Sequence, residues 1–406
     1  MNKKEVLELK KRYSKNGCTF TKLSGCYVNA EKETVLTFHE TFLNLDEEEF
    51  YKYLEVAKKT LSGTLGNNLL ELEFPLEEEK SGGKQQFLMG LRESKLKNEG
   101  LLETFYQLII DSYDYAGNYL ILIFHDAYDV MKKTSDNVKL DESEEVFEYL
   151  LVAICPVTLT KPGLGYLETE NRIGPRNRDW VVEAPETGFI FPAFTDRSTD
   201  IHSVMFYAKN PKEPHRELIE LALGCPPKAT ATEQKDTFHK IIKTAVQDTE
   251  QSNKVFVDIQ ERLHLINEER TLEGESDEPV MLTNDTVQEI LKDSELPEEV
   301  ATKIETAYEE NFHDAPPVIE HLIDKKLLAE NERLKVQKSL MEQVQTLQEK
   351  LEEVTKANDA SDYDVVLRVK PEKMPQIKSE IIDGKKCIII PMEEDEQADI
   401  NGVTDL

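Results

Sequence analysis

The order of hydrophobic and polar positions divides this 406-residue chain into a β-rich first half and a mainly helical second half. Alternating or continuously apolar segments predict strands at 18–28, 34–43, 69–74, 119–124, 188–194 and 203–208. Helical periodicity predicts helices at 3–13, 46–60 and 85–111, the last as one helix or two. The apolar run at 145–160 fits a strand as well as a helix that turns into a strand. We therefore predict an α+β or α/β core with a mixed sheet at 1–212.

Beyond residue 212 we predict a series of smaller modules. They are a helical extension at 213–272, a small helical unit at 281–313, a long polar helix at 316–357, a small βαββ-like module at 364–392 and an acidic tail at 393–406. The C-terminal module carries Asp383-Gly384 between two apolar segments, a typical sequence for a tight hairpin turn. The fold class is therefore a multi-domain one, with a helical middle and a β-rich end.

The long helix has a short apolar seam. Residues with four-three spacing, as in a coiled coil, are Leu340, Val344, Leu347, Leu351 and Val354. Residues upstream that lie on a different register are Ile323, Leu327, Leu334 and Met341. The register shift predicts a partial coiled coil instead of a long, uniform zipper. We expect 318–357 to bind a protein partner or a second copy; packing on its own domain is the alternative.

The charge of the chain limits its partners. It has 49 Lys and Arg against 80 Asp and Glu, a net charge of −31. Such a surface repels phosphate backbones and anionic lipid, so we expect no membrane association and no nucleic-acid binding outside a ribosome. The five cysteines include no CxxC pair, and no apolar run has the length of a membrane span or a signal-peptide core. A cytoplasmic location follows as the expectation.

Two predicted buried strands run directly into charged residues, and strand ends are common places for sites. The candidate catalytic residues there are His125, Asp126, Asp129, Asp196, Asp200 and His202. If strands 119–124 and 188–194 are neighbours, these side chains could hold Mg²⁺, Mn²⁺ or Zn²⁺ and activate water, as in a hydrolase or phosphoesterase. The alternative is that they are helix caps, turn residues and salt bridges. No spacing among them matches a metal motif.

A second group of candidates suits ligand binding. Arg176, Arg178 and Arg197 could neutralise a phosphate, and Trp180, the single tryptophan, could stack on a ligand. A partly buried anchor is the alternative for Trp180. Ser81-Gly82-Gly83-Lys84 is no phosphate-binding P-loop, because that motif needs Ser or Thr after the lysine and Gln85 follows here. The sequence names no cofactor.

Several segments of the chain resemble one known family. They are Ser24-Gly25-Cys26-Tyr27-Val28, Lys59 to Gly66, Tyr119 to Val130, Ile154 to Val157, Arg178 to Val181 and Phe194 to His202. Through them the chain resembles, over most of its length, an uncharacterised family of bacterial proteins from clostridia and related Firmicutes that is defined as a domain of unknown function. The resemblance implies no activity.

A weaker resemblance covers residues 74–124. A strand, Gly82-Gly83, a helix and the strand at 119–124 look like the central domain of eukaryotic-type release factors and their ribosome-rescue relatives, which use a Gly-Gly-Gln loop. Lys84 stands in place of that glutamine, and three glutamates at 77–79 replace the family's basic run. Both departures argue against peptidyl-tRNA hydrolysis. The resemblance implies a non-hydrolytic ribosome-associated factor with Gly82 and Gly83 as binding residues.

Three functions follow as expectations. The first is an interaction or regulatory protein without enzymatic activity, since the chain is acidic, lacks cofactor motifs and has a long polar helix. The alternatives are the ribosome-associated factor and the metal-assisted hydrolase.

Overall fold

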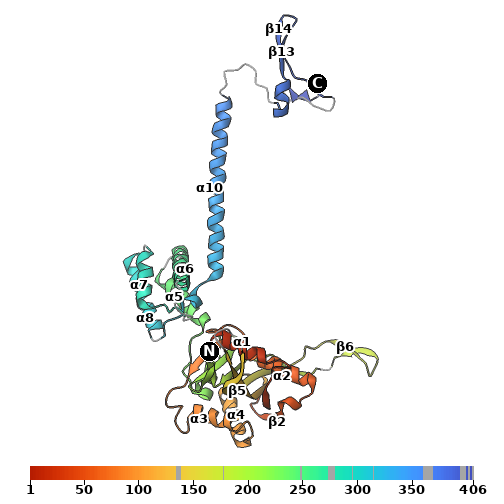
Figure 1. The fold of residues 1–406 in the computed structure, drawn as a ribbon, viewed down its shortest axis with the longest axis vertical. Helices are drawn as coiled ribbons and strands as arrows, with labels where there is room; N and C mark the ends of the chain where they lie inside the picture. The colour runs from red at the N-terminus through yellow and green to blue at the C-terminus, as the bar shows by residue number, and fades with distance from the viewer. Residues whose placement is uncertain are drawn as a thin grey trace. The chain divides into compact units, whose positions relative to one another are not determined.

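A computed structural model describes residues 1–133, 139–176, 178–246, 249–272, 279–294, 296–313, 315–359, 369–393, 399–400 and 403–404. The chain divides into two compact units, Met1–Ala329 and Glu330–Leu406. The first contains an antiparallel sheet with helices, and the second contains most of a long helix and a small β-hairpin module (Figure 1). The expected multi-domain α+β class is confirmed.

Eight described strands form the main sheet, in the order β2-β1-β4-β5-β9-β12-β3 with β8 paired to one end of β5. Their bounds are β1 Phe20–Val28, β2 Thr34–Thr41, β3 Leu69–Glu73, β4 Asn118–Lys133, β5 Lys139–Leu159, β8 Trp180–Val182, β9 Thr187–Phe191 and β12 Ser203–Ala208. Each pairing within this sheet is antiparallel, whereas the sequence led us to expect a mixed sheet.

The ambiguous apolar run at 145–160 belongs to strand β5. This strand pairs with β4 on one side and β9 on the other, and the side chains from Tyr149 to Cys155 are fully buried. A strand covered on both faces has apolar residues at successive positions, so the alternation that identifies strands is lost. The sequence pattern could not distinguish it from a buried helix for that reason.

Helices cover both faces of the sheet. One face packs on α1 (Lys3–Arg12) and α2 (Glu47–Thr60). The opposite face packs on α3 (Lys84–Glu93), α4 (Glu99–Ser112) and the π-helical segment η2 (Leu218–Leu223). Alternate residues of each strand supply the two faces: Ile121 and Ile123 of β4 contact the second group, and Leu122 contacts the first.

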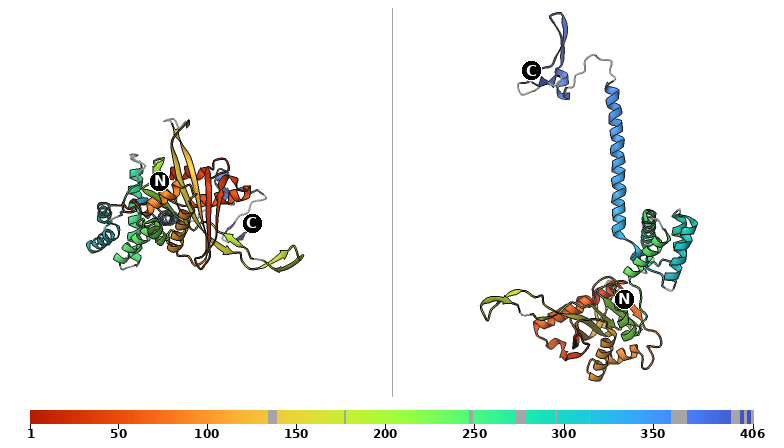
Figure 2. Two further views of the ribbon diagram at one scale, coloured as in Figure 1. Left: turned by 90° about the horizontal axis from the view of Figure 1, so that it is seen from below. Right: turned by 180° about the vertical axis from the view of Figure 1, so that it is seen from behind.

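Smaller elements complete the core region. The short 3-10 turn η1 (Phe42–Asn44) precedes α2, and two further hairpins are β6 (Leu164–Leu167) with β7 (Arg172–Pro175), and β10 (Ala193–Thr195) with β11 (Ser198–Asp200). The β6–β7 hairpin extends away from the main sheet as an arm in each view (Figure 2).

A separate hydrophobic core holds the helical region together. Its helices are α5 (Ala231–Ala245), α6 (Thr249–Leu272), α7 (Asn284–Asp293), α8 (Glu298–Phe312) and α9 (Ile319–Leu322). Buried residues from all five make one cluster, among them Phe238, Leu263, Ile290 and Tyr308. The predicted helical extension and small helical unit therefore share one core.

The long helix α10 spans Lys325–Asp359 and begins later than the sequence pattern suggested. The chain leaves helical geometry at Ile323, which follows the short α9. Ile323 is buried in the helical core, and Leu327 packs against it. This packing explains why Ile323 and Leu327 do not follow the seam that starts at Leu340: they serve the helical core. Leu334 and Met341, also off the seam, are exposed on α10.

The second unit ends in small β elements. After the 3-10 helix η3 (Pro371–Gln376), strands β13 (Lys378–Ile382) and β14 (Lys385–Ile389) form the predicted hairpin. Its turn residues Asp383 and Gly384 have φ angles of 51° and 81°, as a tight hairpin turn requires. A short pair follows, β15 (Asp399–Ile400) with β16 (Val403–Thr404). Residues 364–368, at the start of the predicted βαββ-like module, and most of the acidic tail lie outside the described residues.

Candidate functional site

The two strands that carry the candidate catalytic residues are not neighbours. β4 and β9 lie on opposite sides of β5, because Leu150 of β5 pairs with His125 on one side and with Phe191 on the other. β4 also does not end at Phe124 but continues to Lys133. The charged residues after Phe124 are therefore strand residues within a long hairpin, and the condition for their convergence with 196–202 is not met.

Asp126 lies in a buried polar network on the face covered by α1. Its carboxylate accepts hydrogen bonds from Thr19 Oγ1 at 2.6 Å, Tyr149 Oη at 2.7 Å and the Ala127 amide at 2.9 Å. Tyr13 Oη lies 3.1 Å from Tyr149 Oη and extends the network to the end of α1. Burial raises the pKa of both tyrosines, so they remain neutral donors. The network is closed and satisfies the carboxylate, as a structural role requires.

His125 lies on the opposite face of the sheet. Its Nδ1 is 2.6 Å from Thr21 Oγ1 and its Nε2 is 2.8 Å from Glu148 Oε1. Both contacts are satisfied when the neutral ring carries its proton on Nε2 and the threonine hydroxyl donates to Nδ1. Burial lowers the pKa of His125, although Glu148 acts in the other direction. Lys95 Nζ lies 3.6 Å from the same Glu148 oxygen, and its positive charge also lowers the pKa of His125.

Asp196 and Arg197 are turn residues. They form the two-residue loop between β10 and β11 and have φ angles of 52° and 57°. Asp tolerates this left-handed conformation better than most residues, which accounts for Asp196. Arg197 Nη1 forms an ion pair of 2.6 Å with Glu8 of α1. The binding candidate Arg197 thus attaches the hairpin to α1 and is partly covered there.

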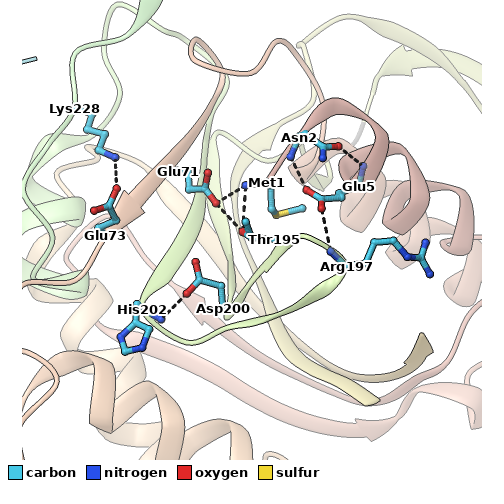
Figure 3. A network of polar contacts seen from close by, with 10 residues as sticks. All are labelled: Met1, Asn2, Glu5, Glu71, Glu73, Thr195, Arg197, Asp200, His202 and Lys228. Carbon is cyan, nitrogen blue, oxygen red and sulfur yellow. Dashed lines mark hydrogen bonds and ion pairs between the residues drawn. The ribbon is translucent and has the colours of Figure 1, made fainter. Parts of the chain in front are cut away.

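The other three candidates at the strand ends also have local roles or lie apart. Asp200 Oδ1 accepts the amide of His202 at 3.0 Å, which is the hydrogen bond of a local Asx-type turn (Figure 3). The exposed His202 ring lies 2.7 Å from Glu79, and this hydrogen bond raises the pKa of His202. Asp129 is exposed on β4. Within the described part of the chain, no three His, Cys, Asp or Glu side chains are placed to hold a metal ion.

A further polar network joins residues 1–5 to the sheet, and the sequence analysis did not predict it. The Met1 ammonium contacts Glu71 of β3 and lies 3.3 Å from Thr195 Oγ1 (Figure 3). Asn2 caps α1, with Glu5 completing a capping box, and the Arg197 amide donates to Glu5 at 3.1 Å. The sequence indicates the capping box by an Asn followed three residues later by a Glu. No local pattern indicates the long-range contacts that Met1 and Glu5 make with Glu71, Thr195 and Arg197.

Gly82 and Gly83 form an ordered loop ahead of α3. Gly82 is exposed with a φ of 93°, and α3 begins at Lys84. The carboxylate of Glu78 accepts the Lys84 amide at 2.6 Å, at the helix N-terminus. A Cβ atom on Gly83 would lie 2.2 Å from the Glu78 carbonyl oxygen. This close approach explains why glycine occupies position 83. Glu78, one of the three glutamates at 77–79, caps α3.

Arg176, Arg178 and Trp180 lie on or beside the β6–β7 arm. Trp180 is 55% exposed, so it is not the partly buried anchor that was the alternative. Arg178 Nε donates to the Thr160 carbonyl at 2.8 Å and holds the two ends of the arm together. Arg176 is exposed, and no ion pair is formed by it with any residue that the structure describes. The arm thus presents cationic and aromatic groups to solvent, whereas Arg197 belongs to a different hairpin, β10–β11.

Four of the cysteines, at 18, 26, 155 and 225, have thiols whose pKa is raised by burial. Burial raises the pKa of Cys155 to about 12 and that of Cys18 to about 11. A thiol with a raised pKa is a weak nucleophile at neutral pH.

No described helix is long and apolar enough to cross a membrane.

A family model described as Domain of unknown function (DUF4317) matches residues 1–403. The chain belongs to this family. The match covers both compact units, so the sheet core, the helical core, α10 and the C-terminal hairpin are parts of one family architecture. No curated protein and no solved structure matches the chain.

Proposed function

We propose that this protein is an interaction protein without enzymatic activity that assembles through α10. The observation that carries the proposal is the exposed seam of this helix. Leu340 and Leu347 are 56% and 65% exposed, and each side chain from Glu332 to Glu353 is exposed. Apolar residues at coiled-coil spacing on a solvated helix gain stability when a second helix covers them.

The seam fits a second copy of the same helix. Counting Val344 as position a places Leu340 and Leu347 at d and Leu351 at the next a. The Val344 and Leu347 heptad has the combination, Val at a with Leu at d, that favours two-stranded parallel coils. The seam covers about two heptads, which makes its association dependent on concentration. Positions beside the seam are largely uncharged, such as Gln343 at g and Gln348 at e, so pairing of like helices meets little repulsion there.

The experiment is light scattering coupled to size-exclusion chromatography on the full chain over a concentration series. The wild type should approach twice the monomer mass as concentration rises. The double variant Leu340→Glu and Leu347→Glu should remain monomeric, because it places four glutamates in the paired seam. Circular dichroism should show that the rest of the fold is kept.

A matched control is available on the outer face of the same helix. Ser339→Glu with Thr346→Glu adds the same charges one residue away from the seam positions, and both sites are exposed. This control should associate like the wild type. A monomeric wild type at all concentrations would contradict the proposal, and so would equal masses for the seam variant and the control.

A second candidate function is ribosome association. It is supported by the exposed loop at Gly82, its φ of 93°, and a helix that begins at Lys84, as the release-factor resemblance implies. The helix ends at Glu93 and a second one follows, so 84–111 is not continuous. Sucrose-gradient sedimentation of cell extract tests this candidate. Recovery only in the free-protein fractions, at both low and moderate salt, would remove it.

A further inference from the structure

The C-terminal hairpin β13–β14 carries apolar side chains that two strands alone cannot bury. Ile381 of β13 is 76% exposed, and Ile388 of β14 is 54% exposed. In the part of the chain that the structure describes, these two strands pair with each other and with no third strand, so the outer edge of each is open. A two-stranded hairpin is marginally stable in water, whereas three or more strands with an apolar face are stable. The hairpin therefore gains stability from a further strand.

The turn determines which backbone groups of β14 are open. Residues 383–384 form a two-residue turn, so Ile382 and Lys385 on either side of it exchange hydrogen bonds within the hairpin. Backbone N–H and C=O groups point to alternate sides along an antiparallel strand. By this alternation Lys386 and Ile388 direct their backbone groups away from β13, and these groups are free to bond another strand.

We propose that β14 pairs with β14 of a second copy in antiparallel orientation and joins the two hairpins into one four-stranded sheet. The register that overlaps all five residues of β14 places Cys387 on the two-fold axis. It sets Lys386 opposite Ile388 of the second copy, and each such pair exchanges both of its open backbone hydrogen bonds. Because the same edge is used by both copies, the contact closes after two.

Charge favours the edge of β14 over the edge of β13. The same full-overlap register on β13 sets Glu380 opposite Glu380 of the second copy, and like charges that face each other across strands are destabilising. On β14 this register sets Lys385 opposite Ile389 and Lys386 opposite Ile388, so no two like charges face each other. The sequence of β14 is therefore compatible with itself, and that of β13 is not.

The inference rests on the proposed function, because pairing of α10 brings the two hairpins together. A parallel coil, which the Val344 and Leu347 heptad favours, places both C-terminal helix ends side by side. Nine residues, 360–368, separate the end of α10 at Asp359 from the described start of the C-terminal module, so each hairpin lies within about 35 Å of its helix end. Tethers of this length give an effective concentration of roughly millimolar. Edge pairing that is weak between separate chains becomes favourable in the dimer.

The test is disulfide trapping on the full chain, at a concentration where light scattering shows a dimer. Cys387 occupies a non-hydrogen-bonded pair with its own copy, where Cα atoms lie about 4.5 Å apart, within the span of a disulfide. Oxidised glutathione should therefore link the wild type through Cys387. A matched control, Cys387→Ser with Glu380→Cys, moves the thiol to the position paired with it on β13. In the four-stranded sheet the two thiols of the control lie about 14 Å apart, so we expect the wild type to exceed its yield by about tenfold.

A pair of proline variants tests which edge is used. The N–H groups of Ile388 and Ile381 both point away from the hairpin, so proline at either site leaves the hydrogen bonds within the hairpin intact. Ile388→Pro removes a donor from the proposed contact and should lower the linked yield to the level of the thiol control. Ile381→Pro removes the same side chain and an N–H on the outer strand, and its yield should stay within about twofold of the wild type. Equal yields for the two proline variants would overturn the pairing.

The two proposals fail in different measurements. A wild type that is dimeric by mass but links no better than the thiol control would overturn the hairpin pairing and leave the α10 proposal standing. The seam variant Leu340→Glu and Leu347→Glu should link about tenfold less than the wild type, because it loses the tether. Undiminished linking in a seam variant, together with a mass that the seam does not change, would support the hairpin contact and overturn the α10 proposal.

Discussion

His125 and Asp126 are consecutive residues of β4, and their side chains lie on opposite faces of the sheet. His125 Nε2 is 2.8 Å from Glu148 on the face that α3 and α4 cover, whereas Asp126 is 2.7 Å from Tyr149 on the face that α1 covers. Successive residues of a strand must diverge in this way. The pair therefore supplies two separate buried networks, and it cannot present an imidazole and a carboxylate to one metal or substrate.

The pH dependence of stability should reveal the buried state of His125. Burial lowers its pKa in the fold, so below about pH 6.5 the unfolded chain binds a proton that the folded chain excludes. Stability from this group is complete above that pH and is lost as the pH falls. The thermal midpoint of His125→Gln should decline less steeply than that of the wild type between pH 7 and 5. His313→Gln, an exposed site, should keep the wild-type slope; equal slopes for all three proteins would contradict the assignment.

Loss of the Asp126 carboxylate should be costly. Asp126→Ala leaves the Tyr149 hydroxyl and the Thr19 hydroxyl without their buried acceptor. We expect the free energy of unfolding to fall by about 2–3 kcal/mol, measured by urea denaturation. The control Asp129→Ala, three residues along the same strand but exposed, should change it by less than about 0.5 kcal/mol. Similar losses at the two sites would show that the network does not stabilise the fold.

Two glycines around α3 should respond in opposite directions to alanine. Gly83→Ala forces a Cβ atom against the Glu78 backbone at 2.2 Å, and we expect destabilisation of about 1–3 kcal/mol. Gly90 lies inside α3, and no atom other than those of its chain neighbours and its own helix backbone lies within 4 Å of its Cβ position, so Gly90→Ala should stabilise the protein by about 0.5–1 kcal/mol. Chemical denaturation of both variants checks this, and a neutral Gly83→Ala would mean that the loop rearranges freely.

The β10–β11 turn allows a matched pair of glycine substitutions. Both turn residues have positive φ, so glycine relieves backbone strain at either one. Asp196→Gly should be neutral or stabilising by up to about 1 kcal/mol. Arg197→Gly also removes the ion pair with Glu8 that holds α1, so it should be less stable than Asp196→Gly by about 1 kcal/mol or more. Equal midpoints in urea would show that this ion pair contributes nothing.

The sequence by itself determined the elements whose signals are local. The α1 helix, the β1–β2 hairpin, α2 and the Asp383-Gly384 turn were predicted close to their observed bounds. Each depends on side-chain periodicity or on turn residues within about ten positions, and such information is present in a short window. The coiled-coil spacing of Leu340 to Leu351 is of the same kind.

Tertiary structure decided what depends on distant pairing. Strand β5 is identified by its two neighbours, since burial on both faces removed its alternation. The start of α10 is fixed by Ile323, which is buried in a core that includes residues as distant in the chain as Phe238 of α5. For the strand-end residues, the strand order and the two-residue period of β4 determine which side chains can meet, and no local pattern encodes that order.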